Sequence, residues 1–340
     1  MKQDTENIQT PDQAPLLKVD DLRTYFPVKK GLLRHTVGYI RAVDGVSFEV
    51  RPGHTVGLVG ESGCGKTTVA RTIIRLIPAT DGTVIFEDFN VLKAKTAQRR
   101  RLRRDVSLIF QDPYGSLNPR MTVGNIVGEP VKVHRKLSGP SLRQYVAQLL
   151  AKVGLSADSI NRYPHEFSGG QRQRIGVARA LALQPKLVIC DEPVSALDVS
   201  IQSQILNLLK NLQAEFGLTY LFIAHDLAVV EFACDIVAVM YMGRIVERAT
   251  AEQLYQNPLH PYTRALMAAI PKVNTAGRGR KTATGGEVPS ALTPPKGCPF
   301  HPRCPLAEQI CTNKRPPLEK KNSGQQKDDY ESHFVACWKC

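Results

Sequence analysis

The sequence predicts an α/β fold in which helices cover a largely parallel sheet. Four short apolar runs, each leading into polar residues, are typical of strands that are buried on both faces of such a sheet: Thr55–Val59, Leu187–Cys190, Tyr220–Ala224 and Ile236–Met240. Apolar residues recur at helical spacing between these runs. Alternation of strands and helices indicates an α/β core.

Length and composition are those of an ordinary globular protein. The 340 residues suggest two domains, and 42% hydrophobic with 22% charged residues excludes a disordered or low-complexity chain. No apolar run reaches the roughly 18 residues that span a bilayer. Met1–Pro15 is polar and acidic, unlike a signal peptide. We therefore expect a cytosolic protein that can attach to a membrane partner.

The net charge of +14 suggests an anionic partner. Seven of the 45 Lys and Arg residues lie between Lys93 and Arg104, in a segment expected to form a short exposed helix. Such a helix is either a solvated basic face or a site for phosphates or lipid headgroups. Charge alone does not distinguish the two.

The N-terminal part is predicted to be antiparallel. Leu16–Val28 and Ile40–Val50 alternate between apolar and polar residues and end in turn residues, as paired strands do, with an excursion at Lys29–Gly38. One helix is expected after the first buried run and another before the third. Their apolar faces comprise Val69, Ile73 and Ile77 in the first and Ile201, Ile205, Leu208 and Leu212 in the second.

A stretch from Asp112 to Glu166 interrupts the alternation. It opens on the Pro-, Gly- and Asn-rich Asp112–Pro119 and continues with helix-like segments near Val123–Val127 and Ser141–Val153. We interpret it as a helical subdomain inserted into the core, at about residues 112–180. The expected domains are therefore a flexible N-terminus (1–15), a main unit (16–270), a Gly-, Thr-, Pro- and Lys-rich linker (271–297) and a Cys-rich module (298–340).

One segment matches the phosphate-binding loop pattern in full: Gly60, Glu61, Ser62, Gly63, Cys64, Gly65, Lys66 and Thr67. A buried strand precedes it and an amphipathic helix follows, which is the context that the motif requires. The glycines let backbone N–H groups wrap a phosphate, and the helix N-terminus adds a positive dipole end. We expect Lys66 to neutralise the β- and γ-phosphates, Thr67 to ligate Mg²⁺ and Thr68 to reach the α-phosphate.

Two acidic residues follow the buried strand Leu187–Cys190. A nucleotide hydrolase needs a carboxylate for Mg²⁺ and a group that orients water. We expect Asp191 to supply the first, through water, and Glu192 to act as the general base. Two acids after a strand can also cap a helix, but their pairing with a phosphate loop favours the catalytic role.

A second anion-binding helix start consists of Ser168, Gly169, Gly170 and Gln171. A second phosphate cradle is useful only if it serves a partner's nucleotide. The segment resembles the signature motif of ABC-transporter ATPases, with Phe167 where leucine is commoner. The other motifs of that family are present in the expected order over about residues 16–270, as Gln111 for the Q-loop, Ser195–Asp198 for the D-loop and His225 for the H-loop.

The resemblance implies an ABC-type P-loop ATPase core that forms a head-to-tail dimer with two ATP molecules at the interface. Each site would combine the phosphate loop of one chain with the Ser168–Gln171 segment of the other. His225 would hold the γ-phosphate, and Gln111 would sense Mg²⁺ and water. No essential position departs from the pattern, so we predict an active ATPase. An aromatic residue should stack on adenine: Tyr25 ends the first strand, and Tyr39 is the competitor.

Further segments are similar to the ATPases of oligopeptide, dipeptide and nickel importers: Gln111–Arg120, Asp191–Ser200, His260–Thr263 and Gly297–Cys304. In that group the two ATPase subunits are usually paralogues, so the partner cassette is a paralogue or a second copy of this chain. The resemblance also implies two membrane-spanning permease subunits, an external solute-binding protein and a peripheral location on the cytoplasmic face of the inner membrane. Peptides are the expected cargo, and nickel or another small solute is the alternative.

Five of the eight cysteines lie in the last 43 residues. Cysteines in a cytosolic chain argue against disulfides. The first three of this group lack the close pairs of zinc sites, although Cys337 and Cys340 have that spacing. In the importers that the chain resembles, the tail holds a 4Fe-4S cluster, whose ligand spacing is more variable. The implied ligands are Cys298, Cys304, Cys311 and Cys337, with zinc and free thiols as alternatives and Cys340 as a spare thiol.

Two other functional classes compete with the importer. A soluble ABC ATPase acting on ribosomes or nucleic acid would suit the positive charge. Such proteins commonly carry two cassettes or a long coiled-coil insertion, and this chain has neither. An exporter or regulatory cassette is disfavoured by the importer-like tail. We therefore expect membrane subunits and no nucleic acid as partners.

Overall fold

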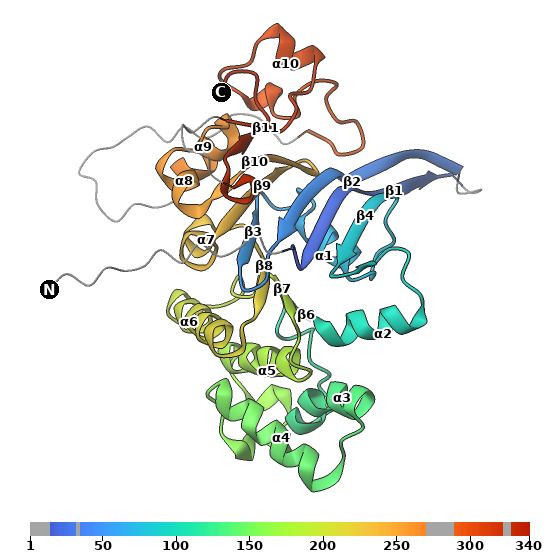
Figure 1. Cartoon of the computed structure of the whole chain (residues 1–340), viewed down its shortest axis with the longest axis vertical. Coiled ribbons are helices and arrows are strands. Elements are labelled where there is room, and N and C mark those ends of the chain that lie inside the picture. Colours follow the sequence, from blue (N-terminus) through green and yellow to red (C-terminus); the bar gives the residue numbers. More distant parts are fainter. Residues whose placement is uncertain (1–13, 32–34, 270–288, 322–327) are drawn as a thin grey trace, which may run out of the picture.

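The computed structural model describes residues 14–31, 35–269, 289–321 and 328–340, and it confirms the α/β prediction with two sheets and covering helices (Figure 1). The smaller sheet is four-stranded and antiparallel, in the order β2-β1-β4-β5. Its strands are β1 (Leu17–Lys30), β2 (His35–Val50), β4 (Asp81–Phe86) and β5 (Phe89–Asn90).

The larger sheet is eight-stranded, in the order β11-β12-β10-β9-β3-β8-β7-β6. Its centre is parallel, and the four apolar runs predicted to be strands are all there. The strands are β3 (Thr55–Val59), β6 (Val106–Ile109), β7 (Leu187–Asp191), β8 (Thr219–Ala224), β9 (Ile236–Tyr241), β10 (Arg244–Thr250), β11 (Glu319–Lys320) and β12 (Phe334–Val335).

Both faces of this sheet are buried, which explains the continuous apolar runs. Along β7, Val188 and Cys190 belong to a core shared with the helical subdomain, whereas Leu187 and Ile189 belong to a core shared with the smaller sheet. The helices outside the subdomain are α1 (Lys66–Ile73), α2 (Thr96–Asp105), α6 (Val199–Phe216), α7 (Leu227–Ala233), α8 (Ala251–Gln256), α9 (Pro261–Ala268) and α10 (Gln309–Asn313).

The helical subdomain lies at one end of the molecule, opposite α10 (Figure 1). It contains α3 (Val123–Arg135) and α4 (Gly139–Lys152), which pack on α5 (Gly169–Leu181). Both segments predicted to be helical fall in α3 and α4. Among the described residues, no helix is both long and apolar enough to cross a membrane.

The structure differs from the sequence prediction in local detail. At the two ends of the expected excursion Lys29–Gly38, residues 29–30 belong to β1 and residues 35–38 to β2, because the β1–β2 pairing continues to Lys30 opposite His35. These residues are exposed on both faces, so alternation gave no signal. Helix α1 ends at Ile73, and Ile77 lies beyond it. Strand β6 was not predicted; it has only four residues and follows a highly charged helix.

The C-terminal tail joins the main sheet rather than standing apart from it. Strand β12 pairs antiparallel with β10, where Val335 lies opposite Glu247, and β11 pairs with β12. The buried carboxylate of Glu247 accepts a hydrogen bond from the backbone N–H of Leu259 and lies 2.7 Å from Nε2 of His333. The expected N-terminal tail (1–15) and linker (271–297) lie largely outside the described residues.

Candidate nucleotide-hydrolysis site

The phosphate loop connects β3 to α1, and two of its glycines are required by backbone geometry. Gly60 and Gly65 have φ values of 154° and 111°. A Cβ atom on Gly60 would lie 2.2 Å from the carbonyl oxygen of Met240, and one on Gly65 would lie 2.1 Å from that of Ala42. No side chain fits at either place, so the loop passes directly against its neighbours.

Lys66 begins α1 and lies across the loop, with only 4% of its surface exposed. Its ammonium group donates hydrogen bonds to the carbonyl oxygens of Gly60 at 2.7 Å and Glu61 at 3.1 Å. The sulfur of Cys64 lies 3.8 Å from the same nitrogen. The loop therefore holds a positive charge at its centre, as binding of a polyphosphate requires.

Thr67 and Asp191 meet although they come from different elements. The Thr67 hydroxyl, in the first turn of α1, donates to Oδ1 of Asp191 at 2.9 Å. Asp191 ends β7 and is 2% exposed. Burial raises the pKa of its carboxyl group, and the hydrogen bond from Thr67 opposes that shift. Hydroxyl and carboxylate oxygens are the donors that Mg²⁺ prefers, so this pair fits the predicted metal position.

Glu192, Gln111 and His225 form a second cluster beside this pair. Oε2 of Glu192 accepts a hydrogen bond from the Gln111 amide at 2.9 Å and lies 3.0 Å from Nδ1 of His225. The three residues follow β7, β6 and β8, whose carboxyl ends lie at the same edge of the parallel sheet. Five of the residues predicted to act on nucleotide and metal are thus assembled at this edge: Thr67, Gln111, Asp191, Glu192 and His225.

The Ser168–Gln171 segment lies elsewhere. Ser168 caps α5: its hydroxyl accepts from the Gln171 N–H at 3.3 Å, and the Gln171 side chain accepts from the Ser168 N–H at 3.0 Å. A Cβ atom on Gly170 would lie 2.6 Å from Ile201, and one on Gly169 would lie 3.4 Å from Leu197. This segment therefore packs beside the D-loop.

Comparisons with known proteins agree with this geometry. A family model described as ABC transporter matches residues 43–195, and one for the C-terminal region of oligopeptide/dipeptide transporters matches residues 246–311. The chain is 48% identical to the oligopeptide transport ATP-binding protein AppF of Bacillus subtilis, over 96% of this chain and 98% of that one. It is 52% identical to OppF of Escherichia coli, over 92% and 95%.

The chain belongs to the ABC-transporter ATPases. Among solved structures, the dimeric ATP-binding cassette MJ0796 bound to ADP and phosphate is similar, with a TM-score of 0.61 and 28% identity over 69% of this chain and 98% of that one. The predicted family, fold and ATP-hydrolysing activity are therefore confirmed.

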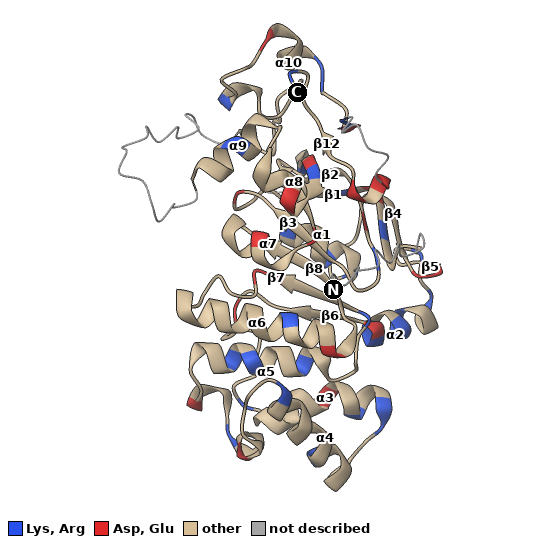
Figure 2. Cartoon of the chain, turned by 60° about the vertical axis from the view of Figure 1, so that its left-hand side comes forward, with Lys and Arg blue, Asp and Glu red and all other residues tan. Residues whose placement is uncertain are grey.

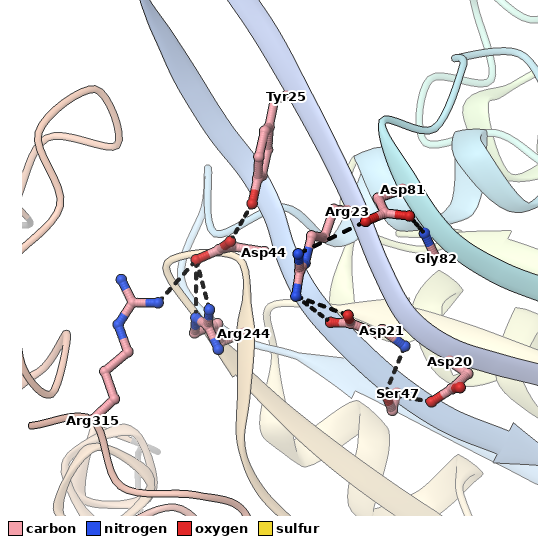
Figure 3. A network of polar contacts seen from close by, with 10 residues as sticks. All are labelled: Asp20, Asp21, Arg23, Tyr25, Asp44, Ser47, Asp81, Gly82, Arg244 and Arg315. Carbon is pink, nitrogen blue, oxygen red and sulfur yellow. Dashed lines mark hydrogen bonds and ion pairs between the residues drawn. The ribbon is translucent and has the colours of Figure 1, made fainter.

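In this ABC ATPase, the tyrosine chosen for adenine stacking does not end the first strand, because β1 continues to Lys30. It is engaged in a network that the sequence did not suggest (Figure 3). The Tyr25 hydroxyl donates to Oδ1 of Asp44 at 2.5 Å. Arg244 and Arg315 donate to Oδ2 of Asp44 at 2.8 and 3.2 Å. Burial favours the neutral carboxyl, but the hydrogen bonds from Tyr25 and Arg244 outweigh it and lower the pKa of Asp44. Tyr39, the competitor, is 52% exposed.

The four cysteines singled out in the tail line one small pocket: Cys298, Cys304, Cys311 and Cys337. Burial raises the pKa of Cys298 to about 11, whereas a hydrogen bond from Cys340 lowers that of Cys337 to about 6. The sulfur of Cys340 also lies 3.0 Å from the carbonyl oxygen of Leu259. In the described ranges, no three His, Cys, Asp or Glu side chains are arranged to hold a single metal ion.

Proposed function

We propose that this ABC ATPase powers the import of di- and oligopeptides through a membrane transporter. The observation that carries the hydrolytic part is the assembly of the phosphate loop with the Thr67–Asp191 pair and the Glu192 cluster at one sheet edge. The printed names of similar proteins support the cargo, since AppF and OppF are oligopeptide transport proteins and the DppF of Escherichia coli, 46% identical, is a dipeptide transport protein.

Each residue at this edge has a proposed role in ATP hydrolysis. Lys66 and the loop amides of residues 60–68 offset the phosphate charge, and Thr67, Asp191 and Gln111 hold Mg²⁺. Bound Mg²⁺ would neutralise charge on the phosphate oxygens. Glu192 accepts a proton from the attacking water, and His225 holds the γ-phosphate.

A head-to-tail dimer completes the proposed site. Ser168, Gly169, Gly170 and Gln171 pack beside the D-loop of their own chain, and they would serve the ATP of a partner cassette. The dimeric state of the similar cassette MJ0796 supports this arrangement. The partner is a paralogue or a second copy, and Tyr25 is the proposed adenine-stacking residue.

A groove beside the Q-loop is the proposed docking site for the membrane-spanning permease. It has a volume of about 410 Å³ and lies between α1, α2 and β6. Leu76, Leu102, Leu108 and Phe110 line it together with Arg75, Arg99, Arg103 and Arg179. Figure 2 marks in blue the positions of Lys and Arg along α2 and α5. A groove lined by apolar side chains and arginines suits a short amphipathic helix with acidic residues.

The location and domain roles follow from this assembly. The ATPase would lie on the cytoplasmic face of the inner membrane, bound to two permease subunits that receive cargo from an external binding protein. The main unit (16–270) would hydrolyse ATP, and its helical subdomain (about 112–180) would transmit the change to the permease.

We also propose that the Cys-rich module (298–340) holds a 4Fe-4S cluster. The presence of Cys298, Cys304, Cys311 and Cys337 in the lining of one pocket supports this assignment, because thiolates are the usual ligands of such clusters. A bound cluster would cross-link the module and so stabilise it, because the module is too small to form a large hydrophobic core. Iron and sulfide contents near zero after anaerobic purification would contradict the cluster, and stoichiometric zinc would indicate the alternative metal.

The decisive experiment on function is the ATPase activity of the complete transporter in vesicles with its loaded binding protein. Stimulation by di- or oligopeptides is the expected result. Stimulation by Ni²⁺ alone would support the importer proposal but replace peptides with nickel as the cargo. Failure to assemble with any permease would overturn the importer proposal and leave the ATPase.

A further inference from the structure

Glu61, the second residue of the phosphate loop, is held by the C-terminal part of the chain. Both terminal nitrogens of Arg303 donate to its carboxylate, at 2.8 and 2.9 Å. The Arg303 side chain is 6% exposed and that of Glu61 29%. A bidentate ion pair of this kind fixes orientation as well as distance. The two residues are 242 positions apart.

A second contact reaches the backbone of the same residue. The N–H of Glu61 donates to the hydroxyl of Tyr262 at 2.8 Å. Tyr262 is fully buried in α9 and packs on Tyr241 and Phe300, with ring centroids 4.6 and 5.4 Å away. Glu61 is therefore anchored at two points, through its side chain to Arg303 and through its amide to a buried aromatic cluster.

The third contact connects Glu61 to the functional lysine. Its carbonyl oxygen accepts a hydrogen bond from the ammonium group of Lys66 at 3.1 Å. Displacement of Glu61 therefore moves an acceptor that orients the charge on which phosphate binding depends. The chain of contacts runs from Arg303 through Glu61 to Lys66.

Arg303 also neutralises a charge that opposes ATP. The Glu61 carboxylate is negative and belongs to the loop that must receive a triphosphate, so leaving it unpaired would repel the ligand. Arg303 lies in the 301–303 turn, directly before Cys304. The N–H of His301 donates to the carbonyl oxygen of Cys298 at 3.0 Å, which ties this turn to the Cys-lined pocket.

We propose that Arg303 is a positioning residue of the ATP site, and that through Glu61 it makes the Cys-rich module part of the nucleotide-binding machinery. The proposal depends on ATP binding by this chain and not on the cargo of the transporter.

Equilibrium binding of a fluorescent ATP analogue with Mg²⁺ to the full chain tests the proposal. We expect Arg303→Gln to raise the Kd about tenfold. Arg303→Lys keeps the positive charge but cannot form the bidentate pair, so it should raise the Kd less. Glu61→Gln should raise it severalfold, and the Glu61→Gln/Arg303→Gln double variant should be no weaker than Arg303→Gln alone. The matched control is Lys320→Gln, which removes one cation of the exposed Lys320–Asp329 pair in the same module and should leave the Kd unchanged.

Two results would overturn the proposal. One is a wild-type Kd for Arg303→Gln. The other is full additivity of the two single substitutions, which would show that Arg303 does not act through Glu61. If Arg303→Gln fails to fold, as judged by circular dichroism, the partly exposed Glu61 still provides the test: a wild-type Kd for Glu61→Gln would then refute the proposal.

Discussion

Glu192 shows how the site is built at the scale of single residues. Its carboxylate contacts Gln111, 81 positions earlier, and His225, 33 positions later. Its backbone has a φ of 49°, a left-handed conformation that costs about 1 kcal/mol or more for a residue with a side chain. The N–H of Glu192 donates to the carbonyl oxygen of Ile223 at 2.9 Å, which helps to hold this conformation. The strain places the carboxylate where the ends of three strands meet.

Replacement of Glu192 by Gln tests its role as general base. The amide keeps the size and most hydrogen bonds but cannot accept a proton, so turnover should fall by about 100-fold or more while ATP still binds. Steady-state ATPase assays with nucleotide-trapping measurements check this. Glu231→Gln, an exposed change on α7, is the control. Ordinary turnover in the Glu192 variant would refute the role.

At the scale of elements, glycine is required by the backbone in the phosphate loop but not in the middle of helix α5. Gly60 and Gly65 accept no Cβ atom because backbone oxygens lie too close. Gly176, in the middle of α5, has φ in the helical range and nothing within 4 Å of a Cβ atom. The same residue type is therefore obligatory in the phosphate loop and replaceable in α5.

Gly176→Ala should stabilise the protein. Alanine loses less backbone entropy in a helix, and the expected gain in the free energy of unfolding is about 0.5–1 kcal/mol. Urea denaturation measures it, with Gly65→Ala as the opposite case that should lower stability and weaken ATP binding. A loss of stability in Gly176→Ala would show that α5 is more tightly packed than the structure indicates.

The histidine that caps helix α9 should make the free energy of unfolding depend on pH. His260 is 1% exposed, and burial lowers its pKa from 6.5 to about 4. Its Nδ1 accepts the N–H of Tyr262 at 3.0 Å, so the ring must be neutral to cap the helix. The unfolded chain therefore binds a proton between pH 6.5 and 4 that the folded chain excludes.

Stability should accordingly fall as pH drops through this range, by up to about 3 kcal/mol from this group alone. Denaturation curves at pH 7, 6 and 5 measure the slope. In His260→Asn, where a non-titrating side chain can cap the helix, the slope should flatten. An unchanged slope in that variant would exclude His260 as its source.

At the scale of the whole molecule, the proposed nucleotide site has residues at both ends of the chain's fold. The phosphate loop is anchored by the C-terminal module, whereas Ser168–Gln171 belong to the end that carries the helical subdomain. A head-to-tail partner would bring the two together, and motion of the helical end would then be coupled to the state of the nucleotide.

Ser168→Arg tests this division. The bulky cation would obstruct the proposed partner site without touching the phosphate loop of its own chain. We expect the Kd for ATP to stay within about twofold and turnover to fall by about 100-fold, because hydrolysis needs the assembled interface. Binding and ATPase assays check both, with Ser203→Arg on the exposed face of α6 as the control. Loss of ATP binding in the Ser168 variant would place that residue in its own chain's site.

Much of this protein could be predicted from sequence because its main signals are local. Buried parallel strands appear as continuous apolar runs, and a phosphate loop needs its glycines, lysine and threonine within eight consecutive positions. The ordered motifs were sufficient to indicate the family and to name Thr67, Gln111, Asp191, Glu192 and His225, which the structure brings together.

Only the tertiary structure decided how the C-terminal module contacts the ATPase core. The pairs Arg303–Glu61 and Arg315–Asp44 join residues 242 and 271 positions apart. Such pairs arise because β12 joins β10 and carries the module back onto the core, and neither periodicity nor spacing encodes that return. In the sequence, Glu61 is one more residue of the loop pattern. In the fold, it is the residue through which Arg303 and Tyr262 hold the loop, and these partners are brought to it only by tertiary packing.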